Sequence, residues 1–168
     1  MIMDHKLKLM VVDDSPLFRT WLIRSLSEDD RFQVVGYAVN ALDAQEKIPL
    51  LQPDMLTLDI EMPGMSGIDF LKQLLPVHPI PVILVSSLNL RVFDALEAGA
   101  VDFVRKPDEA NGLSKEIFLS MLRSKLLVAA ASHVHLPSVP ASPQAAKKRI
   151  VSPLTAAGNP FLNRPKTS

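Results

Sequence analysis

Polar residues that could bind a cation or an anion follow four short apolar runs of this chain. Carboxylate ligands without nearby histidine or cysteine favour Mg²⁺, which takes one or two carboxylates together with water and phosphate oxygens. A lysine adds a mobile positive charge that suits an anion. These residue types therefore predict a site for a divalent cation and a phosphoryl group. The residues are Asp13 and Asp14, Asp59, Ser86 and Ser87, and Lys106.

Three clustered carboxylates would need a cation. Two like charges about 4 Å apart repel by about 4 kcal/mol at an effective dielectric near 20, and a divalent ion removes this repulsion. We expect Asp59 to attack phosphorus, while Lys106 and a serine hydroxyl hold other oxygens of the phosphoryl group. The resulting acyl phosphate is reactive and short-lived, which suits a switch.

Each of these residues also has an ordinary explanation. Asp13 and Asp14 precede Ser-Pro, where acidic residues often cap a helix. Ser86 and Ser87 fit a loop, and Lys106 fits a solvated surface. Their joint placement favours a site, because unrelated surface residues would seldom fall at one edge of the same sheet.

Five apolar runs alternate with segments of helical character. This alternation is typical of a parallel sheet that is covered by helices on both faces. In such sheets the carboxyl ends of the strands form the edge at which ligands bind. The runs are Leu7 to Val12, Phe32 to Val39, Met55 to Leu58, Pro81 to Val85 and Val101 to Val104.

We expect five helices between and after these strands. Ser15 can cap the first, with Pro16 in its first turn, where a missing N–H costs nothing. Pro49 or Pro53 should stop the second, and Ser66 can cap the third. The second helix should span about Ala41 to Ile48 and the fifth about Leu113 to Ala130. The fourth should span about Leu90 to Ala98 and end at Gly99, which can adopt the left-handed conformation of a helix C-cap. The inward stripes are Phe18, Leu22 and Leu26, then Ile68, Leu71 and Leu75, and last Phe118, Leu122 and Leu126.

The composition favours a soluble cytoplasmic protein. Lys plus Arg and Asp plus Glu number 18 each, and this balance suggests no nucleic-acid partner. The chain has no cysteine, which excludes disulfides and thiol nucleophiles. No apolar run approaches the roughly 18 residues of a membrane span, so we expect no membrane insertion.

The composition changes near Ser132. Six of the 14 prolines lie between Pro137 and Pro165. We therefore expect one folded domain over residues 1–131 and a flexible linker or disordered tail over residues 132–168. His133 and His135 have too few companions to predict a metal site, and the basic run at 147–149 should be solvated.

Four stretches, in this order, resemble response-regulator receiver domains. The resemblance covers about residues 7–127 and implies a flavodoxin-like, doubly wound α/β fold with five helices and strand order 2-1-3-4-5. The stretches are VVDDSP (Val11 to Pro16), LTLDIEMPGMSGIDFL (Leu56 to Leu71), PVILVSS (Pro81 to Ser87) and ALEAGAVDFVRKP (Ala95 to Pro107).

The resemblance implies a phosphoacceptor and a metal site. Asp59 matches the phosphoacceptor, which receives its phosphoryl group from a histidine kinase. Asp13 and Asp14 match the acidic pair that binds Mg²⁺ together with Asp59. Glu61 matches the position whose backbone carbonyl completes the metal site.

The resemblance also implies a switch. Ser86 matches the hydroxyl that turns toward the phosphoryl group, and Phe103 matches the aromatic switch residue, although ordinary strand packing is the alternative for Phe103. Lys106 matches the lysine that contacts the phosphoryl group and precedes a cis-proline, Pro107. The face formed by helix four, strand five and helix five would then bind a receptor or an output domain.

Within the receivers, LTLDIEMPGMSGIDFL, VSSL and GAVDFVRKP are most similar to the regulatory half of the chemotaxis protein-glutamate methylesterase. The segment from Ser86 to Gly99 is shorter than in that family by about a turn of helix. The catalytic half of that enzyme needs a serine in a glycine-rich turn with a distant histidine and aspartate. No Gly-x-Ser-x-Gly occurs here, and no acid follows Glu116. We therefore expect a regulatory module and not an enzyme, either a stand-alone receiver or a truncated methylesterase.

The leading prediction is a phosphorylation-controlled binding module of two-component signalling, of the chemotaxis type. The alternative is a Mg²⁺-dependent phosphohydrolase with an aspartyl-phosphate intermediate, in which Glu61 would be the general acid. The lack of a cap domain and the spacing from Ser86 to Lys106 favour the receiver. A nucleotide-binding domain ranks third, because neither Gly-x-Gly-x-x-Gly nor a Walker lysine loop is present.

Overall fold

A computed structural model of the chain describes residues 6–87 and 91–135. The expected tail from Ser132 lies outside the described residues except for its start, which belongs to the last helix. The basic run at 147–149 and the side chains of His133 and His135 also lie outside. Within the described part of the chain, no helix is both long and apolar enough to cross a membrane.

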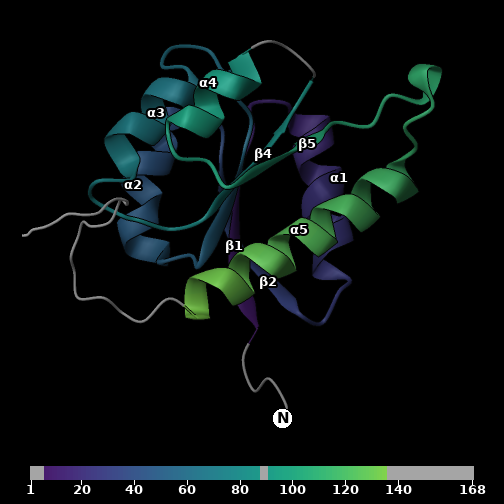
Figure 1. The fold of residues 1–168 in the computed structure, drawn as a ribbon, viewed down its shortest axis with the longest axis horizontal. Coiled ribbons are helices and arrows are strands. Elements are labelled where there is room, and N and C mark those ends of the chain that lie inside the picture. The colour runs from purple at the N-terminus through teal and green to yellow at the C-terminus, as the bar shows by residue number, and fades with distance from the viewer. Residues whose placement is uncertain (1–5, 88–90, 136–168) are drawn as a thin grey trace, which may run out of the picture. The chain divides into compact units, whose positions relative to one another are not determined.

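Five parallel strands form one sheet in the order β2-β1-β3-β4-β5 (Figure 1). This arrangement confirms the doubly wound fold that the alternating pattern and the family resemblance predict. The strands are β1 (Leu7–Val12), β2 (Phe32–Ala38), β3 (Met55–Leu58), β4 (Val82–Ser86) and β5 (Asp102–Arg105).

Two strands begin and end one residue later than expected. Pro81 has no N–H to donate to the ladder, so β4 begins at Val82. At the other end Ser86 is still part of the ladder and pairs with Arg105 of β5. Ser86 is therefore a buried strand residue and not the loop residue that its type suggested.

Helices cover both faces of the sheet. α1 and α5 lie on one face, and α2, α3 and α4 lie on the other (Figure 1). A short 3₁₀ helix, η1 (Glu109–Asn111), lies between β5 and α5. The helices are α1 (Pro16–Ser27), α2 (Ala41–Leu51), α3 (Gly67–Leu74), α4 (Arg91–Glu97) and α5 (Lys115–His135).

The core has two layers, because side chains alternate between the two faces of a strand. Leu9 and Val11 of β1 pack with the apolar side chains of α1 and α5. Met10 and Val12 pack with those of α2, α3 and α4. The predicted inward stripes are buried, apart from Phe18 and Leu75, which are partly buried.

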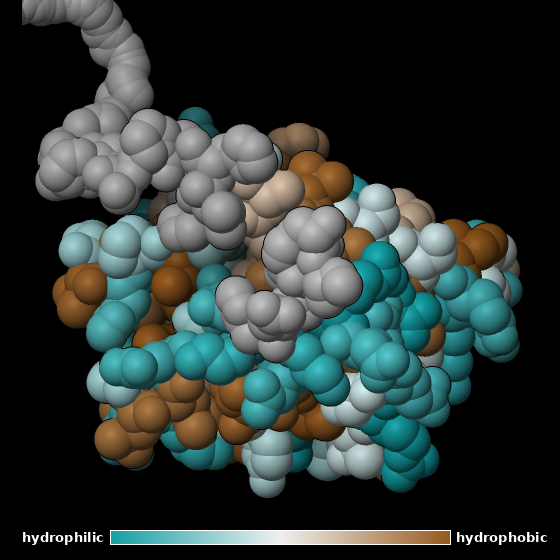
Figure 2. Space-filling model, turned by 90° about the horizontal axis from the view of Figure 1, so that it is seen from below, coloured by the Kyte–Doolittle hydropathy of each residue, from teal (hydrophilic) through white to brown (hydrophobic). Residues whose placement is uncertain are grey.

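The outer surface also carries apolar side chains. Leu17 on α1 and Leu50 on α2 are among the most exposed. Figure 2 shows one face of the molecule, on which apolar side chains form separate groups among polar ones. Single exposed apolar residues are common on folded proteins and alone identify no binding site.

Side-chain caps fix the helices that begin at the carboxyl edge of the sheet. The Ser15 hydroxyl accepts a hydrogen bond from Phe18 N at 3.4 Å, and Pro16 occupies the first turn of α1. The Ser66 hydroxyl accepts from Asp69 N at 3.2 Å at the start of α3. Both caps agree with the sequence prediction. They fix where the loops after β1 and β3 end and the helices begin.

α2 passes the first of its two expected proline stops and ends before the second. The helix continues through Pro49 to Leu51 and stops at Gln52, which has a positive φ of 49°. Pro49 lies in the last turn, where a missing N–H removes one helical hydrogen bond and leaves most of the helix intact. Of the two expected stops, Pro49 is therefore wrong, whereas Pro53 agrees with a helix that ends just before it.

The last two helices also differ in length from the expected spans. α5 runs to His135 and not to Ala130, because no glycine or proline occurs between Ser114 and Pro137. α4 ends at Glu97, and Gly99 follows with a φ of 121°, as its predicted role at the helix end requires. Leu90, the expected start of α4, lies outside the described residues.

Candidate functional site

Asp59 lies at the carboxyl end of β3, at the centre of the sheet edge. Its N–H donates to the Val12 carbonyl of β1, and its side chain is buried, with 5% of the residue exposed. Oδ1 accepts hydrogen bonds from the Ser86 hydroxyl at 3.2 Å and from Glu61 N at 3.1 Å. Oδ2 accepts from Lys106 Nζ at 3.3 Å. Residues at the carboxyl ends of β3, β4 and β5 thus meet at one carboxylate.

Asp13 and Asp14 follow β1, the neighbouring strand. The Asp13 N–H donates to the Ala38 carbonyl of β2, which extends the sheet pairing to the first acid. Asp13 Oδ1 accepts from Ser15 N at 2.8 Å, and Oδ2 forms an ion pair with Lys106 Nζ at 3.0 Å. Asp13 is buried, whereas Asp14 is exposed.

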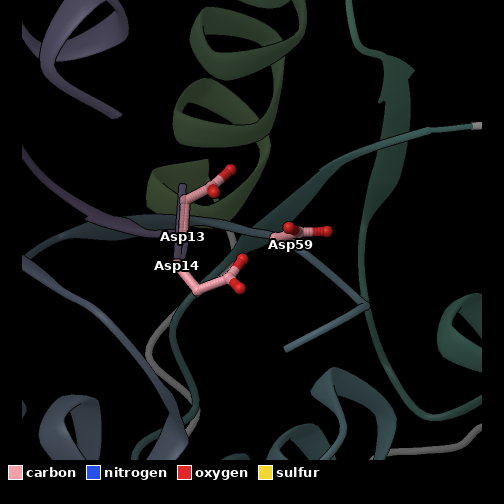
Figure 3. A group of neighbouring side chains, drawn as sticks. All are labelled: Asp13, Asp14 and Asp59. Atoms are coloured by element: carbon pink, nitrogen blue, oxygen red, sulfur yellow. The ribbon is translucent and has the colours of Figure 1, made fainter. Parts of the chain in front are cut away.

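The carboxylates of Asp13, Asp14 and Asp59 form one cluster (Figure 3). One ligand oxygen from each lies within 4.8 Å of the others. Two oxygens on opposite sides of a Mg²⁺ ion are about 4.2 Å apart, so small side-chain rotations would bring these oxygens to ligand distance. Within the described residues the Asp14 carboxylate makes no hydrogen bond or ion pair. The donor set therefore fits a hard divalent cation.

Lys106 stands directly after β5. Its N–H donates to the Ser86 carbonyl at 3.0 Å, which holds the backbone against β4. Its ammonium contacts Asp13 and Asp59, and it also lies over the ring of Phe18, 4.6 Å from the ring centroid. Burial acts to lower the pKa of this ammonium, but the two carboxylates outweigh burial and raise the pKa above its ordinary value.

The pKa of the Asp59 carboxyl is also raised above its ordinary value. Burial is the main cause, since it disfavours the charged form. Lys106 acts in the opposite direction, and the nearby charge of Asp13 adds to the effect of burial. The surroundings of Asp59 thus disfavour its charge, and a cation bound beside it would favour that charge.

Phe103 lies in β5, paired with Leu84 of β4. It is partly buried and packs against the core cluster that includes Val92 and Ala95 of α4. Its carbonyl accepts a hydrogen bond from Lys125 Nζ of α5 at 2.8 Å. This packing is compatible with a switch residue and with ordinary strand core, so its role stays a prediction.

Three other predicted site residues occupy the loops at this edge. Ser87 follows Ser86 and is exposed. Glu61 is also exposed, and its N–H donates to Asp59, while the metal role of its carbonyl stays a prediction. The expected cis bond before Pro107 is wrong, because the described residues contain no cis peptide bond. The trans form of an X–Pro bond is favoured by only about 0.5–1 kcal/mol, so a motif does not decide the isomer.

Two residues of α1 reach the site although the sequence did not single them out for it. Phe18 was assigned to the core, yet its ring faces Lys106. Arg19 Nη1 donates to the Asp13 carbonyl at 2.8 Å, and its guanidinium stacks 4.7 Å from the ring centroid of Tyr37. Their positions on the first turn after the acidic pair are the signal that could have identified them.

Gly67 at the start of α3 allows the helix to approach Asp59 closely. A Cβ atom at this position would lie 2.8 Å from both the Asp59 carbonyl oxygen and Ile60 Cα. The Gly67 N–H donates to the Ile60 carbonyl at 2.8 Å. Glycine is needed at position 67 because any side chain would collide with the backbone of Asp59 and Ile60.

Comparison with known proteins identifies relatives of the chain. The response regulator receiver domain family matches residues 9–118. A protein-glutamate methylesterase/protein-glutamine glutaminase 2 from Syntrophomonas wolfei is 46% identical over 130 residues, which are 77% of this chain and 38% of that protein. The protein of the same name from Vibrio vulnificus is 43% identical over 137 residues, 79% of this chain and 40% of that protein. The chain thus spans about two fifths of the length of these curated relatives.

Solved structures agree with this relationship. The response regulator domain of Thermotoga maritima CheB has a TM-score of 0.67 and 36% sequence identity, over 76% of this chain and 98% of that chain. The match includes the edge that carries Asp13, Asp59 and Lys106, since all three lie within residues 9–118. A receiver domain is a regulatory module of two-component signalling. By sequence and by fold, the chain belongs to the family of response regulator receiver domains.

Proposed function

We propose that this chain acts in the cytoplasm and accepts a phosphoryl group on Asp59 from a histidine kinase, in a magnesium-dependent reaction of chemotaxis-type signalling. One observation carries the proposal. The buried Asp59 carboxylate lies beside two further acids and also accepts hydrogen bonds from Ser86 and Lys106. A nucleophile, a cation site and two donors for an anion therefore meet at one point.

Each residue has a distinct part in the proposed reaction. An Asp59 carboxylate oxygen attacks phosphorus, and the bond from phosphorus to the kinase histidine breaks as the new bond forms. Lys106 and the Ser86 hydroxyl donate to oxygens of the transferred group. Asp13, Asp14 and Asp59, with the Glu61 carbonyl, would hold Mg²⁺, which neutralises phosphoryl charge.

The proposed output is a change in the face formed by α4, β5 and α5. Ser86 at the end of β4 and Phe103 in β5 would bias this face between two states. A shift from mostly inactive to mostly active needs a few kcal/mol of differential stabilisation, which charge-assisted hydrogen bonds from Ser86 and Lys106 can supply. Phe93 on α4 and Ile117 on α5 expose apolar surface that a partner could cover.

We propose that residues 1–131 form the receiver, that α5 continues it to His135, and that the chain beyond α5 is a linker or tail. The partner at the α4, β5 and α5 face would be a receptor or an output domain such as a methylesterase. The curated relatives are longer than this chain and carry that enzyme's name. Neither nucleic acid nor membrane insertion has a part in the proposal.

In the phosphohydrolase alternative the Glu61 side chain, and not its backbone carbonyl, takes part in the reaction. Its carboxyl would have to protonate the leaving group of a bound phosphate monoester. The family match over residues 9–118 favours the receiver. Steady turnover of a small phosphate monoester by the parent, lost in Glu61→Gln, would favour the enzyme instead.

Labelling with radioactive acetyl phosphate tests the proposal. With Mg²⁺ present, label should approach one phosphoryl group per chain, and hydroxylamine, which cleaves acyl phosphates, should remove it. Asp59→Asn and chelation of Mg²⁺ should each abolish labelling. Asp30→Asn, which changes an exposed acid outside the site, is the matched control and should label like the parent. Labelling of Asp59→Asn at the parent's rate would refute the proposal.

A further inference from the structure

The aromatic ring of Phe18 is a neighbour of the Lys106 ammonium in addition to the carboxylates. Lys106 Nζ lies 4.6 Å from the ring centroid, 3.0 Å from Asp13 Oδ2 and 3.3 Å from Asp59 Oδ2. A cation within about 6 Å of an aromatic ring centroid is attracted by the ring quadrupole. Lys106 is thus held by two charged groups and one uncharged one.

Phe18 is itself fixed by an aromatic cluster. Its ring centroid lies 5.7 Å from that of Trp21 on α1 and 5.9 Å from that of Phe118 on α5. Phe118 is fully buried, and its ring and the Phe18 ring are inclined by 63° in an edge-type arrangement. The Phe18 ring, which faces the Lys106 ammonium, is therefore held by contacts with both α1 and α5.

The backbone of Phe18 is tied to the acidic loop. Phe18 N donates to the Ser15 hydroxyl at 3.4 Å, and Ser15 N donates to Asp13 Oδ1 at 2.8 Å. The start of α1 therefore positions the ring and the first acid together. A shift of this turn would move Phe18 and Asp13, two of the three neighbours of Lys106, at once.

The ring and the carboxylates hold Lys106 in different ways. Asp13 and Asp59 accept hydrogen bonds from the ammonium and so compete with a phosphoryl oxygen for its three N–H donors. The ring attracts the charge through its face, without a formal charge of its own. It can therefore keep the ammonium beside Asp59 and still allow it to donate to an arriving anion.

We propose that Phe18 is a positioning residue for phosphoryl transfer to Asp59, acting through Lys106. The inference rests on the proposed function. In the reaction a bond forms between an Asp59 oxygen and phosphorus, and the bond to the donor's leaving oxygen breaks, with its electron pair going to the departing acetate. Asp13, once it shares its charge with a cation, attracts Lys106 less, and Phe18 then holds the lysine near the phosphoryl group.

Initial labelling rates test this role at saturating Mg²⁺ and acetyl phosphate. Phe18→Leu keeps apolar bulk but removes the ring, and it should slow labelling about threefold to tenfold, within the range of a single cation–π contact. Phe18→Tyr restores a ring and should stay within about twofold of the parent. Phe32→Leu removes a buried ring of the same core layer away from the site, and it should also label like the parent.

A spectroscopic readout separates positioning from general damage to the fold. An aromatic ring shifts the resonances of protons above its face upfield, so the Lys106 ε-methylene signal of the parent, assigned by its loss in Lys106→Arg, should lie upfield. This shift should vanish in Phe18→Leu and remain in Phe18→Tyr. Urea unfolding checks that each variant is folded, and Phe18→Met provides a second variant without a ring.

The outcomes distinguish this inference from the proposed function. If the parent is labelled and Phe18→Leu is labelled equally fast, the positioning role is refuted while the phosphoacceptor remains. An unchanged Lys106 signal in Phe18→Leu and Phe18→Met refutes it as well. A parent that takes no label overturns the proposed function, and the positioning role with it.

Discussion

The Ser86 hydroxyl donates a hydrogen bond of 3.2 Å to Asp59 Oδ1, and both side chains are buried. The contact joins the ends of two adjacent strands, β4 and β3. It places a donor next to the proposed nucleophile before any phosphoryl group arrives. Ser86 therefore connects the Asp59 carboxylate to the edge strand β5, with which it pairs at Arg105.

Replacement of Ser86 by alanine should separate phosphoryl uptake from its readout. Asp59 Oδ1 keeps the Glu61 N–H as a donor, so we expect Ser86→Ala to be labelled but to lose about 1 kcal/mol of unfolding free energy. Labelling should then no longer change hydrogen exchange in α4, β5 and α5. Ser86→Thr retains the hydroxyl and should respond, and so should Ser87→Ala. A full response in Ser86→Ala would contradict the proposed switch.

Magnesium should stabilise the protein through Asp14. Mg²⁺ at about 100 times its dissociation constant adds about 2.7 kcal/mol to the free energy of unfolding. Within the described part of the chain the Asp14 carboxylate has no partner, so Asp14→Asn should change stability without metal by less than about 0.5 kcal/mol. Urea unfolding with Mg²⁺ and with chelator should show that Asp14→Asn loses most of the gain, whereas Asp30→Asn keeps it. An undiminished gain would place the metal elsewhere.

The fold and the acidic cluster follow from features that the sequence displays directly. Apolar runs alternate with helical segments, and this pattern alone predicts a parallel sheet with one shared carboxyl edge. Asp13 and Asp59 end their runs, so the topology brings them together without knowledge of any side-chain contact. The helix starts at Ser15 and Ser66 are likewise predictable, because a serine hydroxyl can accept a hydrogen bond from the first turn of a helix.

Other features depend on tertiary contacts and could not be predicted in this way. Phe18 has the spacing of a core residue, and only the tertiary fold brings its ring over Lys106, a residue far away in the sequence. Pro49 remains helical because it falls in the last turn of α2. The isomer before Pro107 rests on a small energy difference that no local pattern decides.

Removal of the Lys106 charge should destabilise the protein when metal is absent. Lys106→Met would leave the buried carboxylates of Asp13 and Asp59 without their cation, a change that typically costs about 3–5 kcal/mol. Urea unfolding in chelator should show this loss, and Mg²⁺ should recover part of it. Lys72→Met changes an exposed lysine and should have little effect. Equal stability of Lys106→Met and the parent would show that the ion pairs of Lys106 with Asp13 and Asp59 contribute nothing to the free energy of unfolding.

The close approach at Gly67 should make this position sensitive to a single methyl group. Gly67→Ala would force the start of α3 away from the backbone of Asp59 and Ile60, and such overpacking costs about 1–3 kcal/mol. Labelling should slow because Asp59 moves. Gly36→Ala is the control, since its Cβ would meet the end of the Leu51 side chain, which can rotate. If both variants behave alike in unfolding and labelling, backbone contact is not the reason for glycine at position 67.

Asp29 links the end of α1 to α5 away from the site. Arg31 donates to both of its carboxylate oxygens, at 2.9 and 2.7 Å, and Arg123 Nε lies 3.6 Å from Oδ2. The hydrogen bond from Arg31 is the main cause that lowers the pKa of Asp29 from 3.8 to about 2. Burial acts in the opposite direction.

The lowered pKa predicts how stability depends on acid. Because the pKa is lower in the folded state than in the unfolded chain, Asp29 stabilises the fold fully above about pH 4, and this contribution disappears as the pH falls through about 2. Asp29→Asn should therefore lose about 1 kcal/mol near neutral pH, a value that allows for solvent screening. Urea unfolding at several pH values should show the curves of parent and variant converge in acid, whereas Asp30→Asn should follow the parent throughout. A gap that stays constant down to about pH 2 would mean that the carboxylate charge of Asp29 does not carry this stability.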